Sequence, residues 1–246
     1  MIDKSLVKKR FKKSLGSYDD NAYVQKITAK KLIQLLPQKI YESVFEAGCA
    51  TGILTREIEK TLKFNFFTAN DIVEESGNFI NSIIKNNIFI AGDIEEIYLG
   101  QKYDLIISNA CLQWCNNIEL TIEKLINSLK PNGILAISIF GDDNLKEITD
   151  IFNIKNKTYS MKNLKKNLEK YNIISYQEEI IKQEFNSPVE LLKSLKLTGV
   201  NAVKEIKLTK TKLKEFEEKY KKLYTQNEKV ILTYNPVYIL ISSDKK

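Results

Sequence analysis

The sequence contains no histidine, and this absence excludes several classes of enzyme. A Ser-His-Asp triad, acid–base catalysis by an imidazole and most zinc sites all need that side chain. Cysteine is scarce too: Cys49, Cys111 and Cys115 form no Cys-x-x-Cys pair and leave an odd count. Met1 leads straight into a lysine-rich stretch without the apolar segment of a secretory signal. We therefore expect reduced thiols, no metal and a cytoplasmic protein.

Long apolar runs are also missing. No window approaches the ~18 consecutive apolar residues of a membrane span, so we expect no membrane segment. Hydrophobic residues nevertheless make up 43% of the 246 residues and charged residues 28%. Such a balance is typical of a globular protein with a core, and the length fits one domain.

Positive charge exceeds negative charge, with a formal net charge of +7. Six basic residues and no acidic one lie between Lys4 and Lys13, and a second basic region runs from Lys204 to Lys222. Two interpretations stay open: solvated helix faces, or a surface that attracts an acidic partner. Aromatic residues do not alternate with these lysines as a single-stranded nucleic-acid platform requires, so nucleic acid is the less favoured partner.

Strand-like and helix-like stretches alternate five times in about a hundred residues. Apolar residues recur at helical spacing over residues 22–36, and residues 53–62 and 119–129 are also expected to be helical. The expected strands are residues 43–47, 64–69, 88–91, 103–108 and 134–140. This order predicts a doubly wound α/β fold with a parallel sheet and right-handed crossovers.

The pattern changes after Gly141. Helices are expected at residues 144–153, 161–170, 189–197 and 209–224, and strand-like runs at 173–185 and 230–241. Pro236 in the last run predicts an edge strand or a bulge, because proline has no N–H to donate to a sheet. We expect a single domain over residues 1–246, with a helical cap (1–37), a cofactor-binding half (38–142) and a substrate half whose helices form a lid (143–246).

The first expected strand runs into a turn rich in small residues, at positions 46–52. In a parallel sheet, ligands bind beyond the carboxyl ends of the strands, near the switch in strand order. Small residues let the backbone approach a ligand, and the following helix offers free N–H groups. The Gly-x-Ala-x-Gly spacing is one residue tighter than the pattern that holds a pyrophosphate, which suits the amino-acid part of S-adenosylmethionine. The residues predicted to bind this cofactor here are Glu46, Gly48, Cys49, Ala50 and Gly52; a turn without a ligand is the alternative.

Acidic residues follow at the next two strand ends. Asp71, nineteen residues past Gly52, is placed to accept hydrogen bonds from both ribose hydroxyls, with Ile72 beside it. An acid at this position also fits a helix cap. Asp93 would face the adenine amino group and Ile94 the adenine ring. The order and spacing of these segments together favour an adenosyl cofactor.

The fourth expected strand runs into residues 108–115, which hold an asparagine, two cysteines and the one tryptophan. This segment would lie beside the sulfonium centre, with Asn109 and Leu112 on the cofactor and Gln113 and Trp114 on the substrate. Trp114 fits equally a core aromatic under a helix. The two cysteines lie four residues apart, but we expect no metal site because no histidine is present.

These features resemble the class I methyltransferase fold over residues 40–142. Over nearly the whole chain, the sequence is similar to the malonyl-[acyl-carrier protein] O-methyltransferases of biotin synthesis. The marks of that family are Arg10-Phe11, Tyr18-Asp19, Gln25, Leu36-Pro37, residues 91–95, Ser108-Asn109, residues 112–114, residues 194–196 with Gly199, and residues 232–234. Ala50 and Asn70 depart from the family pattern without blocking cofactor binding. The resemblance implies a mostly parallel, seven-stranded Rossmann-like sheet with a helical lid among the late strands.

The resemblance also implies a reaction. A methyl group would pass from S-adenosylmethionine, leaving S-adenosylhomocysteine, to the free carboxylate of malonyl on an acyl-carrier protein. That carboxylate is already ionised near neutral pH, so no general base is needed. Tyr18 would fold over the cofactor and donate to the carboxylate, and Lys193 or Lys196 would pair with it. The alternatives are another small carboxylate or a quinone-type ring as substrate, or, on charge alone, a nucleic-acid-modifying protein.

Overall fold

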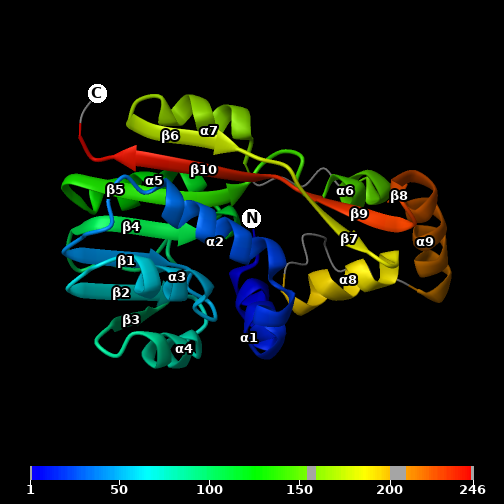
Figure 1. Cartoon of the computed structure of the whole chain (residues 1–246), viewed down its shortest axis with the longest axis horizontal. Coiled ribbons are helices and arrows are strands. Elements are labelled where there is room, and N and C mark those ends of the chain that lie inside the picture. The colour runs from blue at the N-terminus through cyan, green and yellow to red at the C-terminus, as the bar shows by residue number, and fades with distance from the viewer. Residues whose placement is uncertain (1, 154–158, 200–208, 245–246) are drawn as a thin grey trace.

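The computed structural model describes residues 2–153, 159–199 and 209–244, and its centre is a seven-stranded sheet (Figure 1). The strand order is β3-β2-β1-β4-β5-β10-β6. The strands are β1 (Ser43–Ala47), β2 (Phe66–Asp71), β3 (Ile88–Ala91), β4 (Tyr103–Asn109), β5 (Leu129–Phe140), β6 (Asn172–Glu178) and β10 (Pro236–Ser242). β1 to β5 pair in parallel, and β10 runs antiparallel to both of its neighbours. The expected mostly parallel α/β sheet is confirmed.

Helices cover both faces of this sheet. Those on one face are α2 (Tyr23–Leu35), α3 (Ile53–Thr61) and α4 (Ser76–Ile83), and those on the other are α5 (Ile118–Asn127) and α7 (Met161–Leu168). Successive strand residues point to opposite faces, so Val44 lies in the first core and Phe45 in the second. Because both faces are covered, β1, β4 and β10 are buried along most of their length. Among the described residues, no helix is long and apolar enough to cross a membrane.

A smaller lobe, built from residues that follow β5, adjoins the sheet. Its three-stranded antiparallel sheet has the order β7-β9-β8. Its elements are α6 (Lys146–Phe152), β7 (Ile181–Phe185), α8 (Pro188–Leu197), α9 (Lys210–Tyr224), β8 (Thr225–Gln226) and β9 (Lys229–Tyr234). Leu191, Phe216 and Leu232 belong to its separate hydrophobic core. The four helices expected after Gly141 are thus present, with ends that differ by a residue or two; α7 packs on the main sheet and the other three belong to the lobe.

Two expected strands each divide into two. Residues 173–185 form β6 and β7, and residues 230–241 form β9 and β10, because both segments cross between the large sheet and the small one. Asn235, between β9 and β10, links the two crossing segments, because its Nδ2 donates to Glu178 Oε1 and to the Glu179 carbonyl, both at 3.0 Å. A strand-like pattern of residues does not show which sheet each part of the segment joins.

The expectation that Pro236 marks a sheet edge or a bulge is wrong. β10 lies inside the sheet, between β5 and β6. Pro236 is tolerated there because it is the first residue of the strand, and its carbonyl accepts the Glu179 N–H at 3.0 Å. The register shift between β10 and β6 lies further along, between Leu240 and Ile241.

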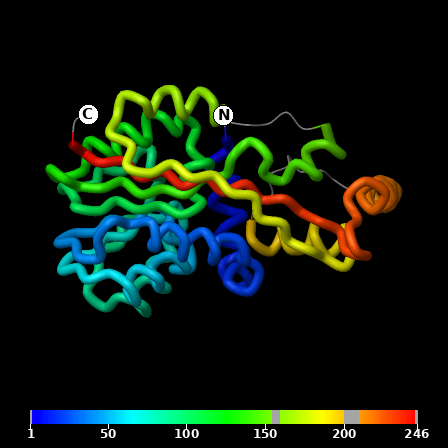
Figure 2. The backbone as a smooth tube through the Cα atoms, turned by 45° about the horizontal axis from the view of Figure 1, so that its top comes forward, coloured from blue at the N-terminus to red at the C-terminus, as the bar shows by residue number. Residues whose placement is uncertain are grey.

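The helix α1 (Lys4–Asn21) lies at the carboxyl ends of the central strands, between the main sheet and the lobe (Figures 1 and 2). Its positions 4, 7, 11, 14 and 18 are buried or partly buried, and their spacing places them on one face of the helix. α1 ends at Asn21, its C-cap Ala22 has a φ of −81° and a ψ of 50° that are not helical, and α2 begins at Tyr23. The segment expected as a helical cap therefore consists of two helices with a break between them.

Candidate active site

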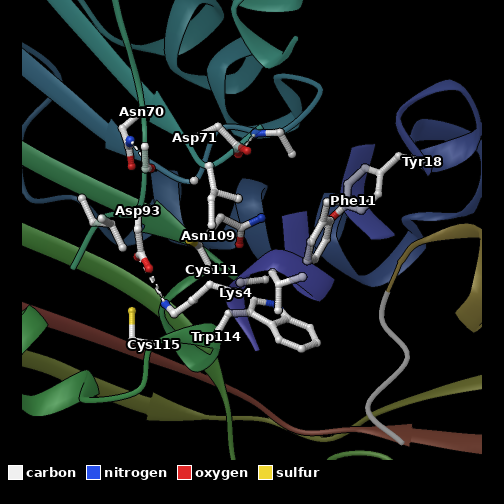
Figure 3. Close-up of a pocket in the computed structure, with 17 residues that line it drawn as sticks. Lys4, Phe11, Tyr18, Asn70, Asp71, Asp93, Asn109, Cys111, Trp114 and Cys115 are labelled. Atoms are coloured by element: carbon white, nitrogen blue, oxygen red, sulfur yellow. Dashed lines mark hydrogen bonds and ion pairs between the residues drawn. The ribbon is translucent and has the colours of Figure 1, made fainter. Parts of the chain in front are cut away.

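A cavity lies at the carboxyl ends of β1 to β4, and α1 forms one of its walls (Figure 3). The residues that line it from the strand ends and the segments after them are Gly48, Ala50, Asn70, Asp71, Ile72, Gly92, Asp93, Ile94, Asn109, Ala110, Cys111, Trp114 and Cys115. Those from α1 are Lys4, Val7, Phe11 and Tyr18. Strand order reverses between β1 and β4, so the cavity lies where open α/β sheets bind their ligands.

The glycine turn, residues 48–52, leads from β1 to α3 through left-handed backbone angles. φ is +74° at Gly48, +46° at Ala50 and +83° at Gly52, a region that favours glycine. A Cβ on Gly48 would lie 2.2 Å from the Cys111 Sγ, and one on Gly52 would lie 2.3 Å from the Ile83 Cδ1. Gly48 is therefore constrained by close approach as well as by backbone angle, whereas the terminal methyl of Ile83 could shift and Gly52 is required chiefly by its backbone angle.

Asp71 fastens this turn to the end of β2. Its Oδ2 accepts the Ala50 N–H and its Oδ1 accepts the Val73 N–H, both at 2.8 Å. Burial raises the pKa of this carboxyl, and the two N–H donors counter the rise in part. Because each carboxylate oxygen can accept more than one hydrogen bond, the geometry accommodates both roles considered for Asp71, the cap and the ribose acceptor.

Asp93 is contacted across the cavity by Lys4 of α1 (Figure 3). The Lys4 Nζ lies 3.0 Å from Asp93 Oδ2 and 2.5 Å from Glu95 Oε2. These side chains are largely buried, with exposed fractions of 23% for Lys4, 12% for Asp93 and 17% for Glu95. Burial alone would lower the pKa of Lys4, but the two carboxylates raise it. The cavity wall thus contains a charged, paired ammonium.

Glu46 and Cys49 lie beside the turn and line a smaller adjoining cavity. The Glu46 Oε2 accepts a hydrogen bond from the Thr55 Oγ1 at 2.6 Å, and the residue is 1% exposed. Burial raises the pKa of Glu46 to about 8, so much of it is protonated near neutral pH. Burial also raises the pKa of the Cys49 thiol, which keeps it a thiol.

Of the four residues predicted on the segment after β4, two line the main cavity, Asn109 and Trp114. Trp114 packs edge-on against Phe11 of α1, with the ring centroids 5.6 Å apart. Leu112 is fully buried in the core of the sheet. Gln113 turns its amide back to a carbonyl of its own segment. The cavity lining therefore includes neither Leu112 nor Gln113.

The residues predicted to act on the substrate lie apart from one another. Tyr18 is on the inner face of α1 and lines both cavities, with 8% of it exposed. Burial raises the pKa of Tyr18, so its hydroxyl keeps its proton near neutral pH and can donate. Lys193 and Lys196 are exposed on α8 and line neither cavity.

Four residues that were not predicted as site residues also line the cavity: Lys4, Phe11, Asn70 and Cys111. The helical spacing of Lys4 and Phe11 with the later Tyr18 was a usable signal, concealed by the lysine-rich composition. Asn70 donates to two carbonyls of the β3 end and its loop, at 2.8 and 2.9 Å. Within the part of the chain that the structure describes, no group of His, Cys, Asp and Glu side chains could hold a metal ion.

Comparison with known proteins identifies the class. The model of the methyltransferase domain family matches residues 21–177. A putative methyltransferase from Bacillus halodurans shares the fold with a TM-score of 0.65 at 13% identity, over 88% of this chain and 99% of that one. The plantazolicin methyltransferase BpumL, solved in complex with SAH, has a TM-score of 0.54 at 17% identity, over 97% of this chain and 94% of that one. The fold is that of a class I methyltransferase.

Closer relatives define the family. A malonyl-[acyl-carrier protein] O-methyltransferase from Calditerrivibrio nitroreducens is 37% identical, over 97% of this chain and 97% of its own. Relatives of the same name from Chlorobium luteolum and Haemophilus influenzae are 33% and 31% identical, over 97% of this chain and 95% and 94% of theirs. The chain belongs to the malonyl-[acyl-carrier protein] O-methyltransferase family.

Proposed function

We propose that this protein transfers a methyl group from S-adenosylmethionine to the free carboxylate of malonyl carried on an acyl-carrier protein, a step of biotin synthesis. The observation that carries the proposal is the match along nearly the whole chain to relatives named for this reaction, with 37% identity in one of them. The domain match over residues 21–177 alone would support a methyltransferase of any substrate. The full-length match also includes the lobe, most of which lies beyond the residues matched by the domain model.

The cavity suits a cationic adenosyl cofactor. Of the described residues that line it, the acids are Asp71 and Asp93, and the basic side chain, Lys4, is already paired. A dinucleotide would place its pyrophosphate at the glycine turn, whose spacing is one residue tighter than the pattern that holds a pyrophosphate, whereas S-adenosylmethionine carries a sulfonium and an ammonium group. The residues that would hold the adenosine part are Asp71, Ile72, Asp93 and Ile94, and those for the amino-acid part are Glu46, Gly48, Cys49, Ala50 and Gly52. Asn109 would lie beside the sulfonium centre, whereas Leu112, predicted there too, is buried outside the cavity lining and is given no contact with the cofactor. When bound, this cofactor supplies an electrophilic methyl group.

The residues of the chain then have to orient the substrate and exclude water. A malonyl carboxylate is ionised near neutral pH, so its oxygen attacks without a general base, and a protein without histidine is sufficient. The protonated Tyr18 hydroxyl would donate to that carboxylate and fix its direction. Correct orientation of the two reactants can lower the activation barrier by about 7–11 kcal/mol. Gln113, Trp114, Lys193 and Lys196 remain predicted substrate contacts.

Methyl transfer from labelled S-adenosylmethionine tests this function directly. Malonyl-carrier protein should be labelled, and acetyl-carrier protein, which lacks the free carboxylate, should not. Transfer to a free small carboxylate or a quinone, with none to malonyl-carrier protein, would contradict the proposed substrate. The protein would still be a methyltransferase. Labelling of RNA alone would favour the nucleic-acid alternative.

A further inference from the structure

The wall of the cavity that α1 provides is one face of a helix. Lys4, Val7, Phe11 and Tyr18 all line the cavity from this face (Figure 3). α1 is separated from α2 by the non-helical Ala22, so the helix can move as a unit about that residue. A ligand held between the strand ends and this face would be enclosed or released according to the position of α1.

The start of α1 is held by a largely buried ion pair. The Lys4 Nζ lies 2.5 Å from Glu95 Oε2 and 3.0 Å from Asp93 Oδ2. The Glu95 carboxylate is itself held, because it accepts the N–H groups of Asn116 and Asn117 at 2.8 and 2.9 Å. Those two residues immediately precede α5. Lys4 thus joins α1 to the loop before α5.

The other end of α1 is fastened more weakly. Asp19 accepts the Thr51 hydroxyl and the Arg56 guanidinium, both at 2.5 Å. The Asp19 and Arg56 side chains are each 43% exposed, so water and salt weaken their attraction. The contacts of Lys4 are much less exposed and therefore less screened. α1 is also held to α8, where the Ser17 hydroxyl donates to the Leu197 carbonyl at 3.0 Å, and to Glu75 through the exposed Lys12. Among these charged attachments, the one at Lys4 is the least exposed and is expected to resist opening most.

We propose that α1 is the gate of the cofactor cavity, and that Lys4, held by Glu95 and Asp93, is the latch that sets how fast the bound cofactor leaves. This inference rests on the proposed adenosyl cofactor. Opening would separate Lys4 from both carboxylates and Phe11 from Trp114. Because Trp114 is the one tryptophan of the chain and packs against Phe11 of α1, its fluorescence reports the movement.

The dissociation rate of S-adenosylhomocysteine, followed by Trp114 fluorescence in a stopped-flow instrument, tests the latch. Lys4→Met should raise this rate by about tenfold or more, since it removes charged hydrogen bonds. Lys4→Arg keeps the charge and should restore much of the slow release. Lys13→Met is the matched control, because Lys13 is an exposed residue of the same helix, and its rate should equal that of the unaltered protein.

A second variant separates the latch from a general loss of stability. Glu95→Gln should also speed release, and the double variant with Lys4→Met should be little faster than Lys4→Met alone, because both changes remove one contact. Thermal unfolding of each ligand-free variant shows whether it folds. An unchanged release rate in folded Lys4→Met, or an equal rise in Lys13→Met, overturns the latch. Failure of the unaltered protein to bind S-adenosylhomocysteine would instead overturn the proposed cofactor.

Discussion

The Cys111 side chain fills the space that a side chain on Gly48 would need. A Cβ at Gly48 would lie 2.2 Å from the Cys111 Sγ and 2.5 Å from its Cβ, and the φ of +74° strains any other residue. Gly48→Ala should therefore lower the free energy of unfolding by about 2 kcal/mol or more. It should also weaken S-adenosylhomocysteine binding by more than about tenfold. Urea unfolding and calorimetry measure the two effects.

Gly16 provides the control for this substitution. It lies within α1, and a Cβ there would meet nothing within 4 Å. Gly16→Ala should leave binding unchanged and stabilise the protein by up to about 1 kcal/mol, because alanine is the better helix former. If Gly16→Ala and Gly48→Ala lost stability and binding affinity equally, the close approach of Cys111 would not constrain the turn.

The turn itself could be predicted from the sequence, but its neighbour could not. A strand followed by Gly-x-Ala-x-Gly is a local pattern, because its backbone angles and the following helix depend on adjacent residues. The contact between Gly48 and Cys111, like that between Lys4 and Glu95, depends on how separate segments meet. The same limit applies to residues 173–185, because the pairing of β6 with β10 and of β7 with β9 depends on segments far along the chain.

The charge of Asp71 is expected to matter for cofactor binding beyond its role in the turn. Asp71→Ala should weaken S-adenosylmethionine binding by at least about tenfold, because charged hydrogen bonds to the ribose are lost. NAD should not bind either protein. Since the alanine variant also releases the N–H groups of Ala50 and Val73, Asp71→Asn is the closer test, as its oxygen can still accept one of them.

Calorimetry with the three proteins decides this point. Asp71→Asn should bind more weakly than the unaltered protein and more tightly than Asp71→Ala. Asp20→Ala, at an exposed position of α1, is expected to keep full affinity. Unchanged affinity in Asp71→Ala would remove this carboxylate from the site.

Glu46 is expected to make stability depend on pH. Burial raises its folded-state pKa to about 8 from an ordinary value of 4.5. Between these two values the unfolded chain loses a proton that the folded protein keeps, so stability falls as pH rises, by up to about 1.4 kcal/mol per pH unit from this group. The loss is absent below pH 4.5 and complete above pH 8. Glu46→Gln should flatten the slope in urea unfolding between pH 5 and 8.

Part of the slope should survive in Glu46→Gln, because burial also raises the pKa of Asp71, and that rise acts in the same direction. Glu59→Gln, at an exposed position of α3, should retain the full slope. If Glu46→Gln has the same pH dependence as the unaltered protein, Glu46 ionises normally in the folded state.

Tyr18 lines both cavities, and the proposed function gives it a role toward the substrate rather than the cofactor alone. Tyr18→Phe keeps the packing of the ring and removes the hydroxyl. Loss of a hydrogen bond from this hydroxyl to the substrate carboxylate would slow the reaction by about tenfold to a hundredfold. Turnover should fall by that factor while the affinity for S-adenosylmethionine changes much less. Tyr23→Phe, whose side chain on α2 is 52% exposed, should keep full activity. Equal turnover of the Tyr18→Phe protein would make Tyr18 a packing residue.

The basic run at the start of the chain is expected to attract an acidic carrier protein. Lys8, Lys9 and Lys12 are exposed on α1, and Lys12 forms an exposed ion pair with Glu75. Attraction between exposed charges is screened at ordinary salt, where the Debye length is about 8 Å. Raising ionic strength should therefore lower kcat/KM for malonyl-carrier protein and leave cofactor binding nearly unchanged. Replacing all three lysines with glutamate should give the high-salt behaviour at low salt.

Two comparisons isolate the site of this attraction. A small malonyl thioester without the protein should respond neither to salt nor to the substitutions, because it lacks the acidic surface. Part of the second basic region, Lys204–Lys222, lies outside the described residues, but Lys219, Lys221 and Lys222 are exposed on α9 and allow a reversal of equal charge. If α1 is the attracting surface, reversal on α9 should change kcat/KM much less than reversal on α1, since direct attraction falls off over a Debye length. Equal effects would make the attraction a property of net charge, and parallel salt responses of both substrates would leave the basic run as a solvated helix face.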